Sequence, residues 1–261
     1  MIIDVNVSLG RWPFQEFEQD TPSKLAAHLE REGISAALVS CIDSILARDP
    51  DSGNRRLFAG LKKHPSLLPV AVINPLLADW PDRLGEYAGI SPVCGVKIYP
   101  GYHGYGLGSK EMGPLMKRLE DDVLPLMIQS RIEDDRSQFP SMMVKPVGVE
   151  EISAFASRHP GNKIICLCLS RGEAAGIMKT ARNVYADISY MDGLNGIPEL
   201  LGEVSSDRVL FGSHTPFLYT ASARMKMMYR EISAQVRGRI ESGNISGILE
   251  ACLSGLNVNL D

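Results

Sequence analysis

Polar side chains that could carry out catalysis recur where short apolar runs of the chain end. In chain order, these candidates are Asn6, Ser8, Lys97, Tyr99, Gln129, Arg131 and His214. His214 is the strongest candidate for a general base, because an imidazole titrates near neutral pH; alternatively, it only packs and hydrogen-bonds to Ser8 or Asn6. Lys97 could polarise a carbonyl group or hold a carboxylate, and Arg131 could bind an anion through two parallel hydrogen bonds. These residue types predict acid–base chemistry on a small anionic or hydroxylated substrate.

Two of these cations also have a purely structural interpretation. Lys97 could form an internal ion pair with Asp4 or Asp187. Arg131 could be neutralised within the charged run of residues 131–136. Both interpretations stay open at the level of the sequence.

A glycine-rich segment after Tyr99 adds Tyr102 and His103 to the candidate substrate-binding residues. Residues 101–109 include four glycines, which permit the backbone movement that a lid needs. We therefore expect this segment to be a mobile lid. The alternative is an ordinary packed loop whose tyrosines are buried.

The elements that must position these residues alternate regularly along the chain. Eight short apolar runs are each followed by a helical pattern, and the runs are residues 2–7, 36–42, 67–73, 93–99, 123–129, 163–169, 184–188 and 208–211. Most runs lack in/out alternation, as expected of parallel strands that are buried on both faces. Eight such units predict an α/β fold, a single (β/α)8 TIM barrel over residues 1–261. An open doubly wound sheet is the alternative, but no glycine-rich phosphate loop follows the first run.

Composition narrows the class of protein further. The chain has 27 basic and 31 acidic residues, a net charge of −4, which argues against a nucleic-acid or membrane-surface partner. No apolar run is long enough to span a membrane, and the N-terminus lacks the basic start of a signal peptide. The five cysteines show no zinc-type spacing, so we expect reduced thiols and a cytoplasmic protein. A small molecule is the expected partner, and a homo-oligomer is left open.

Several segments resemble the amidohydrolase-related TIM barrels in the order expected of that family. The resembling segments are residues 3–10, 95–100, 124–129, 163–170, 183–189 and 210–217. The first, with Asp4, Asn6, Ser8 and Gly10, is similar to a start of the form Asp-x-His-x-His-x-Gly. The last, Leu210–Phe217, is similar to the eighth strand, whose usual form is Phe-Gly-Ser-Asp-x-Pro. The resemblance implies a TIM barrel with its site at the carboxyl ends of the strands.

The metal ligands that the resemblance implies are replaced in this chain. Asn6 and Ser8 stand at the positions of two histidines, and Gln129 stands at a third. Cys168 lies near a fourth, where a buried inert thiol is expected rather than a nucleophile, and His214 replaces a catalytic aspartate. Neutral oxygen donors are poor substitutes for imidazole, so we expect no metal and no cofactor. The alternative is one weakly bound divalent metal such as zinc.

The resemblance and the residues together predict an amidohydrolase-like hydrolase. Its substrate would be a lactone, an amide or a related compound, with His214 and Lys97 as the catalytic residues, and decarboxylation stays open. A protein of this fold that binds a small molecule or partner without catalysis is the alternative. Fold resemblance by itself does not choose between them.

Overall fold

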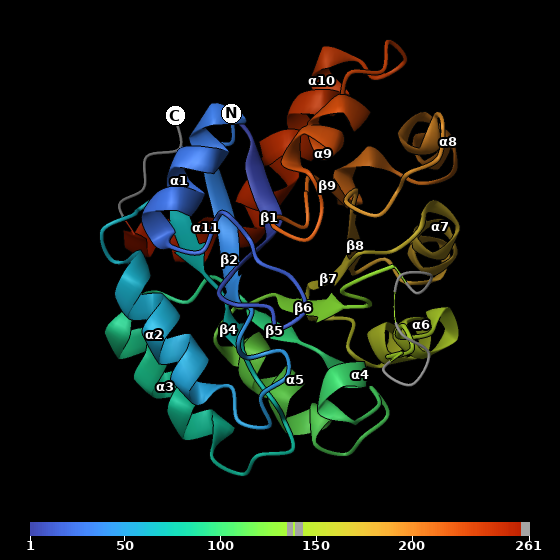
Figure 1. The fold of residues 1–261 in the computed structure, drawn as a ribbon. Helices are drawn as coiled ribbons and strands as arrows, with labels where there is room; N and C mark the ends of the chain where they lie inside the picture. The colour runs from blue at the N-terminus through green and yellow to red at the C-terminus, as the bar shows by residue number, and fades with distance from the viewer. Residues whose placement is uncertain (135–137, 139–142, 257–261) are drawn as a thin grey trace.

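The computed structural model describes residues 1–134, 138 and 143–256, and for residues 251–256 only the backbone. Short strands alternate with helices along this chain (Figure 1). The strands are β1 (Ile3–Leu9), β2 (Ala36–Cys41), β3 (Leu67–Pro69), β4 (Ala71–Val72), β5 (Val96–Ile98), β6 (Leu126–Gln129), β7 (Ile164–Leu167), β8 (Val184–Asp187) and β9 (Val209–Leu210).

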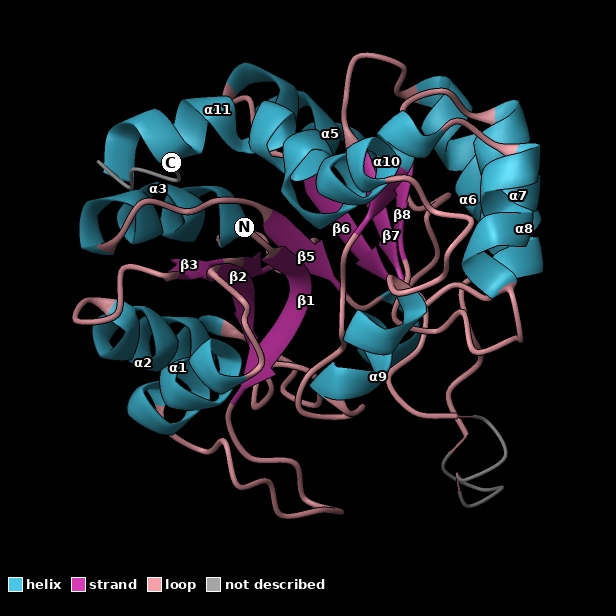
Figure 2. Ribbon diagram, turned by 90° about the horizontal axis from the view of Figure 1, so that it is seen from above, coloured by secondary structure: helices cyan, strands magenta, loops and turns pink. Residues whose placement is uncertain are grey.

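Helices follow the strands and cover the outside of the sheet (Figure 2). They are α1 (Pro22–Arg31), α2 (Asp51–Leu61), α3 (Trp80–Ile90), α4 (Pro100–His103), α5 (Met112–Asp121), α6 (Val149–Arg158), α7 (Arg171–Thr180), α8 (Gly196–Glu203), α9 (Thr220–Lys226), α10 (Ala234–Gly238) and α11 (Asn244–Leu256). The helix α1 begins as its sequence predicts, because Thr21 accepts a hydrogen bond from Lys24 N–H and Pro22 occupies the first turn.

All strand pairs are parallel, and together they form the expected barrel. β1, β2 and β3 pair in that order, and β4 to β9 pair in sequence order. β3 and β4 are one interrupted strand, since Val70 N–H between them still donates to Val39 O of β2. Val5 N–H donates to Phe211 O and Ser8 N–H donates to Thr215 O, so the chain after β9 lies beside β1. The predicted (β/α)8 class is therefore confirmed.

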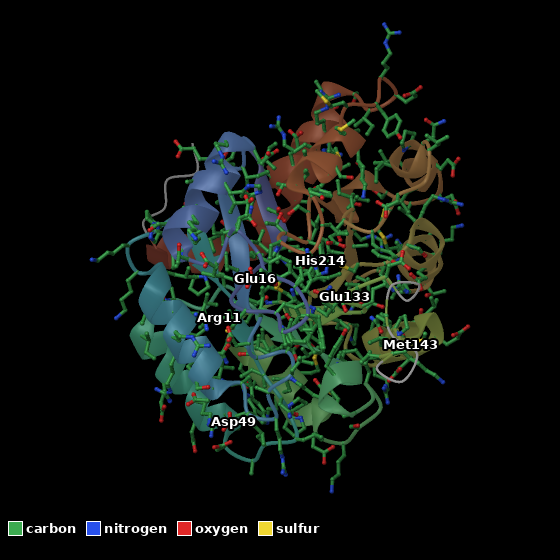
Figure 3. All side chains as sticks on the ribbon, viewed as in Figure 1. Arg11, Glu16, Asp49, Glu133, Met143 and His214 are labelled. Carbon is green, nitrogen blue, oxygen red and sulfur yellow. The ribbon has the colours of Figure 1, made fainter. Side chains whose placement is uncertain are left out.

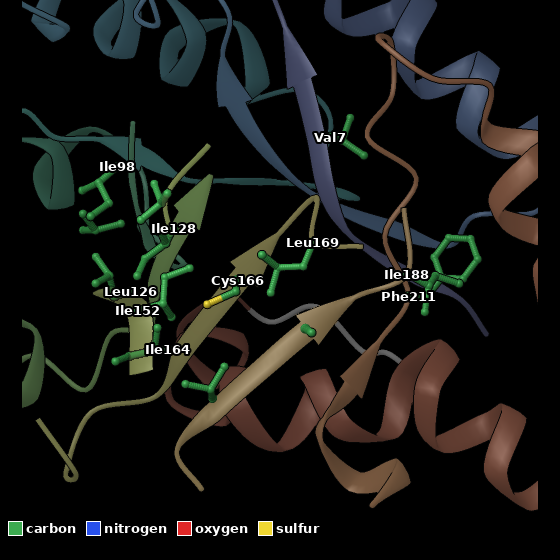
Figure 4. Packing of buried hydrophobic residues seen from close by; sticks show 14 of the residues in the cluster. Val7, Ile98, Leu126, Ile128, Ile152, Ile164, Cys166, Leu169, Ile188 and Phe211 are labelled. Carbon is green, nitrogen blue, oxygen red and sulfur yellow. The ribbon is translucent and has the colours of Figure 1, made fainter. Parts of the chain in front are cut away.

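Apolar side chains form three layers around a polar centre. The largest lies between strands and helices and includes Ile98, Ile128 and Cys166 (Figure 4). A second fills the lower barrel interior, where Ile245 and Ile248 of α11 close the bottom. A third covers the mouth, at the carboxyl ends of the strands. Candidate catalytic side chains lie between the second and third layers.

The structure differs from the sequence prediction in the segment after β5. Pro100–His103 is the short helix α4, which ends at Gly104 with a φ of 73° that favours glycine. Leu107 is 1% exposed and its N–H donates to Glu151 Oε1, 2.6 Å away. His103 donates from Nε2 to Ser44 O at 3.2 Å. These contacts favour the packed loop over the mobile lid.

Two further findings concern the cysteines and the membrane. Cys41, Cys166 and Cys168 are free thiols, whereas Cys94 is disulfide-bonded, which the expectation of reduced cysteines did not include. Over the residues that the structure describes, no helix is long and apolar enough to cross a membrane.

Candidate active site

Three buried side chains meet inside the barrel, below its mouth. Lys97 Nζ of β5 donates to Asn6 Oδ1 of β1 at 3.1 Å. Asn6 Nδ2 in turn donates to Asp187 Oδ2 of β8 at 2.9 Å. None of the three is more than 1% exposed. The direct ion pair considered for Lys97 does not form, because the Asn6 amide lies between the ammonium and the Asp187 carboxylate.

Gln129 and Cys168 complete this cluster on its β6 and β7 side. Gln129 Nε2 lies 3.0 Å from Cys168 Sγ and also donates to Arg131 O. Asn6 Nδ2 lies 3.4 Å from the same sulfur. Gln129 Oε1 is buried and accepts no hydrogen bond within the described part of the chain. The free acceptor of Gln129, rather than its amide hydrogens, is therefore available to a ligand.

His214 lies over the cluster, immediately after β9. Its Nε2–H donates to Ile132 O at 2.7 Å, and its ring stacks on Phe217 with the centroids 5.0 Å apart. Its Nδ1 is buried and without a hydrogen-bond partner among the described residues. Burial, together with the nearby charge of Lys97, lowers the pKa of His214 to about 3. The expectation of an imidazole that titrates near neutral pH is corrected accordingly: His214 is neutral and a weak base.

The remaining hydroxyl candidates form a separate chain of contacts. Ser8 Oγ lies 3.2 Å from Ser40 Oγ, which lies 3.4 Å from the hydroxyl of Tyr99. The Tyr99 ring faces Lys97, with Nζ 5.5 Å from the ring centroid. Tyr102 packs edge-on against Trp12 and so belongs to the cover of the site. The hydroxyl of Ser8 is therefore engaged by Ser40.

Arg131 is held by a partner that the sequence did not suggest. Its two terminal nitrogens donate to the two carboxylate oxygens of Glu173, at 2.8 and 2.6 Å. It also donates to Cys168 O and lies over the Tyr190 ring, 4.9 Å from its centroid. The proposed ion network within residues 131–136 falls partly on residues 135–136, which lie outside the described residues. The Arg131 guanidinium is therefore bound to Glu173 and links the ends of β6 and β7. It is not free to bind an anion through two parallel hydrogen bonds.

Aromatic side chains cover the polar cluster from the mouth side. Trp12 is 5% exposed and packs edge-on against Phe217 at 5.3 Å and Tyr102 at 6.5 Å between centroids. Trp12 Nε1–H donates to Glu133 Oε1 at 3.1 Å and so ties the loop after β1 to the loop after β6. Figure 3 labels Glu133 and His214 near the middle of the molecule, and His214 Nε2–H donates to the carbonyl of Ile132, the residue before Glu133. Beneath this cover, Asn6, Lys97, Gln129 and His214 are 0–3% exposed.

The bond between Trp12 and Glu133 should control how often the cover opens. A hydrogen bond to a charged group contributes ~1.5–3 kcal/mol, so Glu133→Ala should raise the open population by roughly tenfold or more. Iodide quenching of Trp12 fluorescence measures this in a Trp80→Phe background, which leaves Trp12 as the single tryptophan. Glu16→Ala, on the same loop and exposed, is the matched control. Unchanged quenching in Glu133→Ala would mean that aromatic packing alone holds the cover.

Buried charges make the centre of the barrel electrostatically strained. Burial lowers the pKa of Lys97 to about 8. Burial also raises the pKa of Asp4 to about 7, although its Oδ1 accepts from Asn6 N–H and Ser213 N–H at 3.0 Å each. Asp4 Oδ2 has no hydrogen-bond partner within the described residues. Perturbed groups of this kind gather at functional sites more often than elsewhere.

Asp4 should make the folded state less stable as pH rises. Its folded pKa of about 7 exceeds the ordinary value of 3.8, so the unfolded chain releases its proton first. The folded state therefore loses stability from pH 3.8 to 7, and the cost is complete above pH 7. Asp4→Asn, which stays neutral, should gain up to about 4 kcal/mol relative to the unmodified protein between about pH 4.5 and 8. Urea unfolding at pH 4.5 and at pH 8 measures the free energy of unfolding of both proteins, roughly where the effect is small and where it is full. The exposed Asp121→Asn is the control. A stability difference between Asp4→Asn and the unmodified protein that is equal at the two pH values would contradict the raised pKa of Asp4.

Comparison with a protein-family model decides the family. The model described as Amidohydrolase matches residues 43–244. The chain belongs to this amidohydrolase family. Comparison with curated protein sequences gives no match.

Solved structures of amidohydrolase-type barrels share the fold of this amidohydrolase. The 5-carboxyvanillate decarboxylase from Sphingomonas paucimobilis is 14% identical, with a TM-score of 0.71 over 95% of this chain and 98% of that one. The dihydroxybenzoic acid decarboxylase from Polaromonas sp. JS666 is 14% identical, with a TM-score of 0.72 over 97% of both chains. The 5-carboxyvanillate decarboxylase from Novosphingobium aromaticivorans is 14% identical, with a TM-score of 0.74 over 96% of this chain and 97% of that one. At this identity the likeness establishes the fold alone.

These neighbours overturn the expectation of a site without a cofactor. The Polaromonas and Novosphingobium structures both contain bound manganese, so a metal belongs to structures of this group. The residues of this cluster do not fit a divalent cation. Within the described residues, no group of three or more His, Cys, Asp or Glu side chains could hold a metal. The Lys97 ammonium and the Asn6 and Gln129 amide groups present donor hydrogens within this cluster, where a cation needs lone pairs.

Several residues that build the site were not candidates at the level of the sequence. Asp4 and Asp187 entered the sequence analysis as possible ion-pair partners of Lys97, and Glu173 was not considered. Ser189 Oγ lies 3.4 Å from Cys168 Sγ. Asp187 and Ser189 lie at the end of β8 or just after it and so carry the same signal that selected Gln129 and His214. Glu173 lies in the first turn of the helix α7. Its spacing from Ser170 indicates a capping box, but nothing in the local sequence indicates a bond to Arg131.

Proposed function

We propose that this amidohydrolase-family protein is an enzyme that binds a small hydroxylated acid in the centre of the barrel and removes its carboxylate as CO2. One observation carries the proposal: Lys97 is a fully buried ammonium whose single hydrogen-bond partner in the described chain is Asn6 Oδ1. Two buried acceptors without partners there, His214 Nδ1 and Gln129 Oε1, belong to the same cluster. A ligand with an acidic oxygen for Lys97 and two hydroxyls, one for each acceptor, would satisfy all three.

The protonation states favour decarboxylation over hydrolysis. Hydrolysis needs a base to activate water, and a His214 with a pKa of about 3 is a poor one. Decarboxylation needs a proton donor, and a Lys97 with a pKa of about 8 is charged at neutral pH and donates readily. The neighbours named as decarboxylases of hydroxylated aromatic acids support the same reaction class. Hydrolysis of a lactone or an amide, which the sequence favours, is the alternative reaction that the experiment below also measures.

In this mechanism the chain's own residues hold the substrate and move one proton. The substrate hydroxyl donates a hydrogen bond to His214 Nδ1. Lys97 transfers a proton to the carbon that bears the carboxylate. The bond between the two carbons then breaks, its electron pair stays with the protonated carbon, and CO2 leaves. A proton from solvent restores Lys97.

The reaction is tested by incubating the protein with carboxyl-¹³C-labelled 2-hydroxybenzoate, 2,6-dihydroxybenzoate and 5-carboxyvanillate. Each acid is supplied with and without added manganese, because the neighbours contain it. The expected result is labelled CO2 from at least one acid, with loss of activity in Lys97→Met. Hydrolysis of dihydrocoumarin without any CO2 release would replace the proposal with a hydrolase.

A non-catalytic binding protein is the second candidate, favoured by the closed cover. The side chains of Asn6, Lys97, Gln129 and His214 are 0–3% exposed. A binding protein that closes over its ligand would show such a site. Melting temperatures that rise with 2,6-dihydroxybenzoate, in the absence of any turnover, would support this function and contradict the enzyme.

A further inference from the structure

We infer that Asp187 is a positioning residue: it orients the Asn6 amide so that its oxygen faces Lys97 and holds the ammonium in the centre of the site. The catalytic consequence of this inference rests on the proposed function, but the orientation itself does not.

Both oxygens of Asp187 are anchored within the barrel. Oδ2 accepts from Asn6 Nδ2 at 2.9 Å, and Oδ1 accepts from Cys168 N–H at 2.8 Å. The carboxylate also lies directly against Gly212, where an added Cβ would approach Oδ2 to 2.6 Å. Any side chain at position 212 would therefore displace the carboxylate. Asp187 is fully buried, so solvent does not compete for these bonds.

The two ends of an amide make the orientation a binary choice. An ionised carboxylate only accepts hydrogen bonds, and an ammonium only donates them. With Asp187 on one side, Asn6 must turn its Nδ2 toward position 187 and its Oδ1 toward Lys97, where Nζ lies 3.1 Å away. If the amide turned over, two donors would face each other at Lys97. Burial raises the pKa of Asp187, while its hydrogen bonds and the charge of Lys97 oppose that shift. The geometry itself assigns the acceptor side to Asp187, because both its oxygens accept and Asn6 Oδ1 is left for the ammonium.

Several ionisable groups face Lys97 and share its electrostatics. They are Asp4 on β1, the Tyr99 ring after β5, Cys168 after β7, Asp187 on β8 and His214 after β9. The charges of Asp4 and Asp187 favour the charged amine, while burial opposes it. Of these groups, Asp187 and Cys168 both accept from Asn6 Nδ2, at 2.9 and 3.4 Å, so the Asp187 carboxylate is the closer partner of the side chain that binds Lys97 Nζ.

The titration of Lys97 tests the inference without any substrate. The protein is labelled with [ε-¹³C]lysine, the Lys97 signal is assigned with Lys97→Met, and its midpoint is followed over a wide alkaline range. In Asp187→Asn, the amide at position 187 presents a donor to Asn6 and removes a charge, so the Lys97 midpoint should fall by about one unit or more. Exposed Asp121→Asn is the matched control and should leave it unchanged.

An exchange of the two side chains separates positioning from a general structural role. In the double variant Asn6→Asp with Asp187→Asn, the carboxylate at position 6 accepts from Lys97 directly and from the amide at position 187. The Lys97 midpoint should then return to the unmodified value or exceed it. A midpoint that Asp187→Asn leaves unchanged, or that the double variant fails to restore, would overturn the inference.

Failure to fold does not leave the question undecided. If neither variant folds, the unmodified protein supplies the answer, because the Asn6 side-chain amide signals should shift with the Lys97 midpoint. Signals that stay constant through that midpoint would contradict the inference. The proposed function fails separately, when no labelled acid releases CO2 although the Lys97 titration behaves as expected.

Discussion

Lys97→Met should abolish turnover of any acid that the protein decarboxylates, and it should also stabilise the fold at neutral pH. Loss of the proton donor is expected to slow the chemical step by about 10²–10⁴-fold. The stability gain follows from burial, because the pKa of Lys97 is lowered from 10.5 to about 8. Between pH 8 and 10.5 the unfolded chain therefore binds more protons than the folded protein. Below pH 8 the amine is charged in both states, and its burial lowers the free energy of unfolding by ~3 kcal/mol.

Part of this gain is offset, since Asn6 Oδ1 loses its donor at a cost of ~1–3 kcal/mol. The decisive measurement is therefore the pH dependence of urea unfolding rather than one value. The advantage of Lys97→Met should shrink as pH rises from 8 to 10.5. Exposed Lys117→Met on α5 is the control and should show no such trend. Full activity in Lys97→Met would remove the lysine from the mechanism.

His214→Asn should weaken catalysis without removing a titration from the activity profile. In the proposed mechanism His214 is a neutral acceptor at Nδ1, so the loss is that of one hydrogen bond to the substrate. Such a bond is worth ~0.5–1.5 kcal/mol, so the substitution should lower kcat/KM roughly 2- to 10-fold. No limb near pH 6.5 should arise from His214, because burial lowers its pKa from that value to about 3.

Steady-state kinetics across the neutral pH range check both statements. His64→Asn, a histidine between α2 and β3, is the control. One outcome would restore His214 as the general base: a limb near pH 6.5 that disappears in His214→Asn, together with turnover that is slowed about a hundredfold or more.

The sequence by itself determined the fold and the end of the barrel where the site lies. Apolar runs and helical patterns depend only on residues that are close in the sequence. The order of strands and helices can therefore be predicted without knowledge of tertiary contacts. The start of α1 at Thr21 and Pro22 followed from local capping chemistry in the same way. Because parallel strands end at one mouth, residues such as Asn6, Lys97 and Gln129 could be grouped from their places at strand ends.

Only the tertiary structure decided what these side chains do there. Pairing between distant residues has no local signal: Glu173 binds Arg131, and Asp187 orients Asn6. The protonation of His214 depends on burial beneath Phe217 and on the charge of Lys97, neither of which its neighbours in sequence supply. The same holds for the segment after β5, whose glycines suggested a lid. Contacts with Ser44 and Glu151, far away in sequence, fix that segment against the barrel.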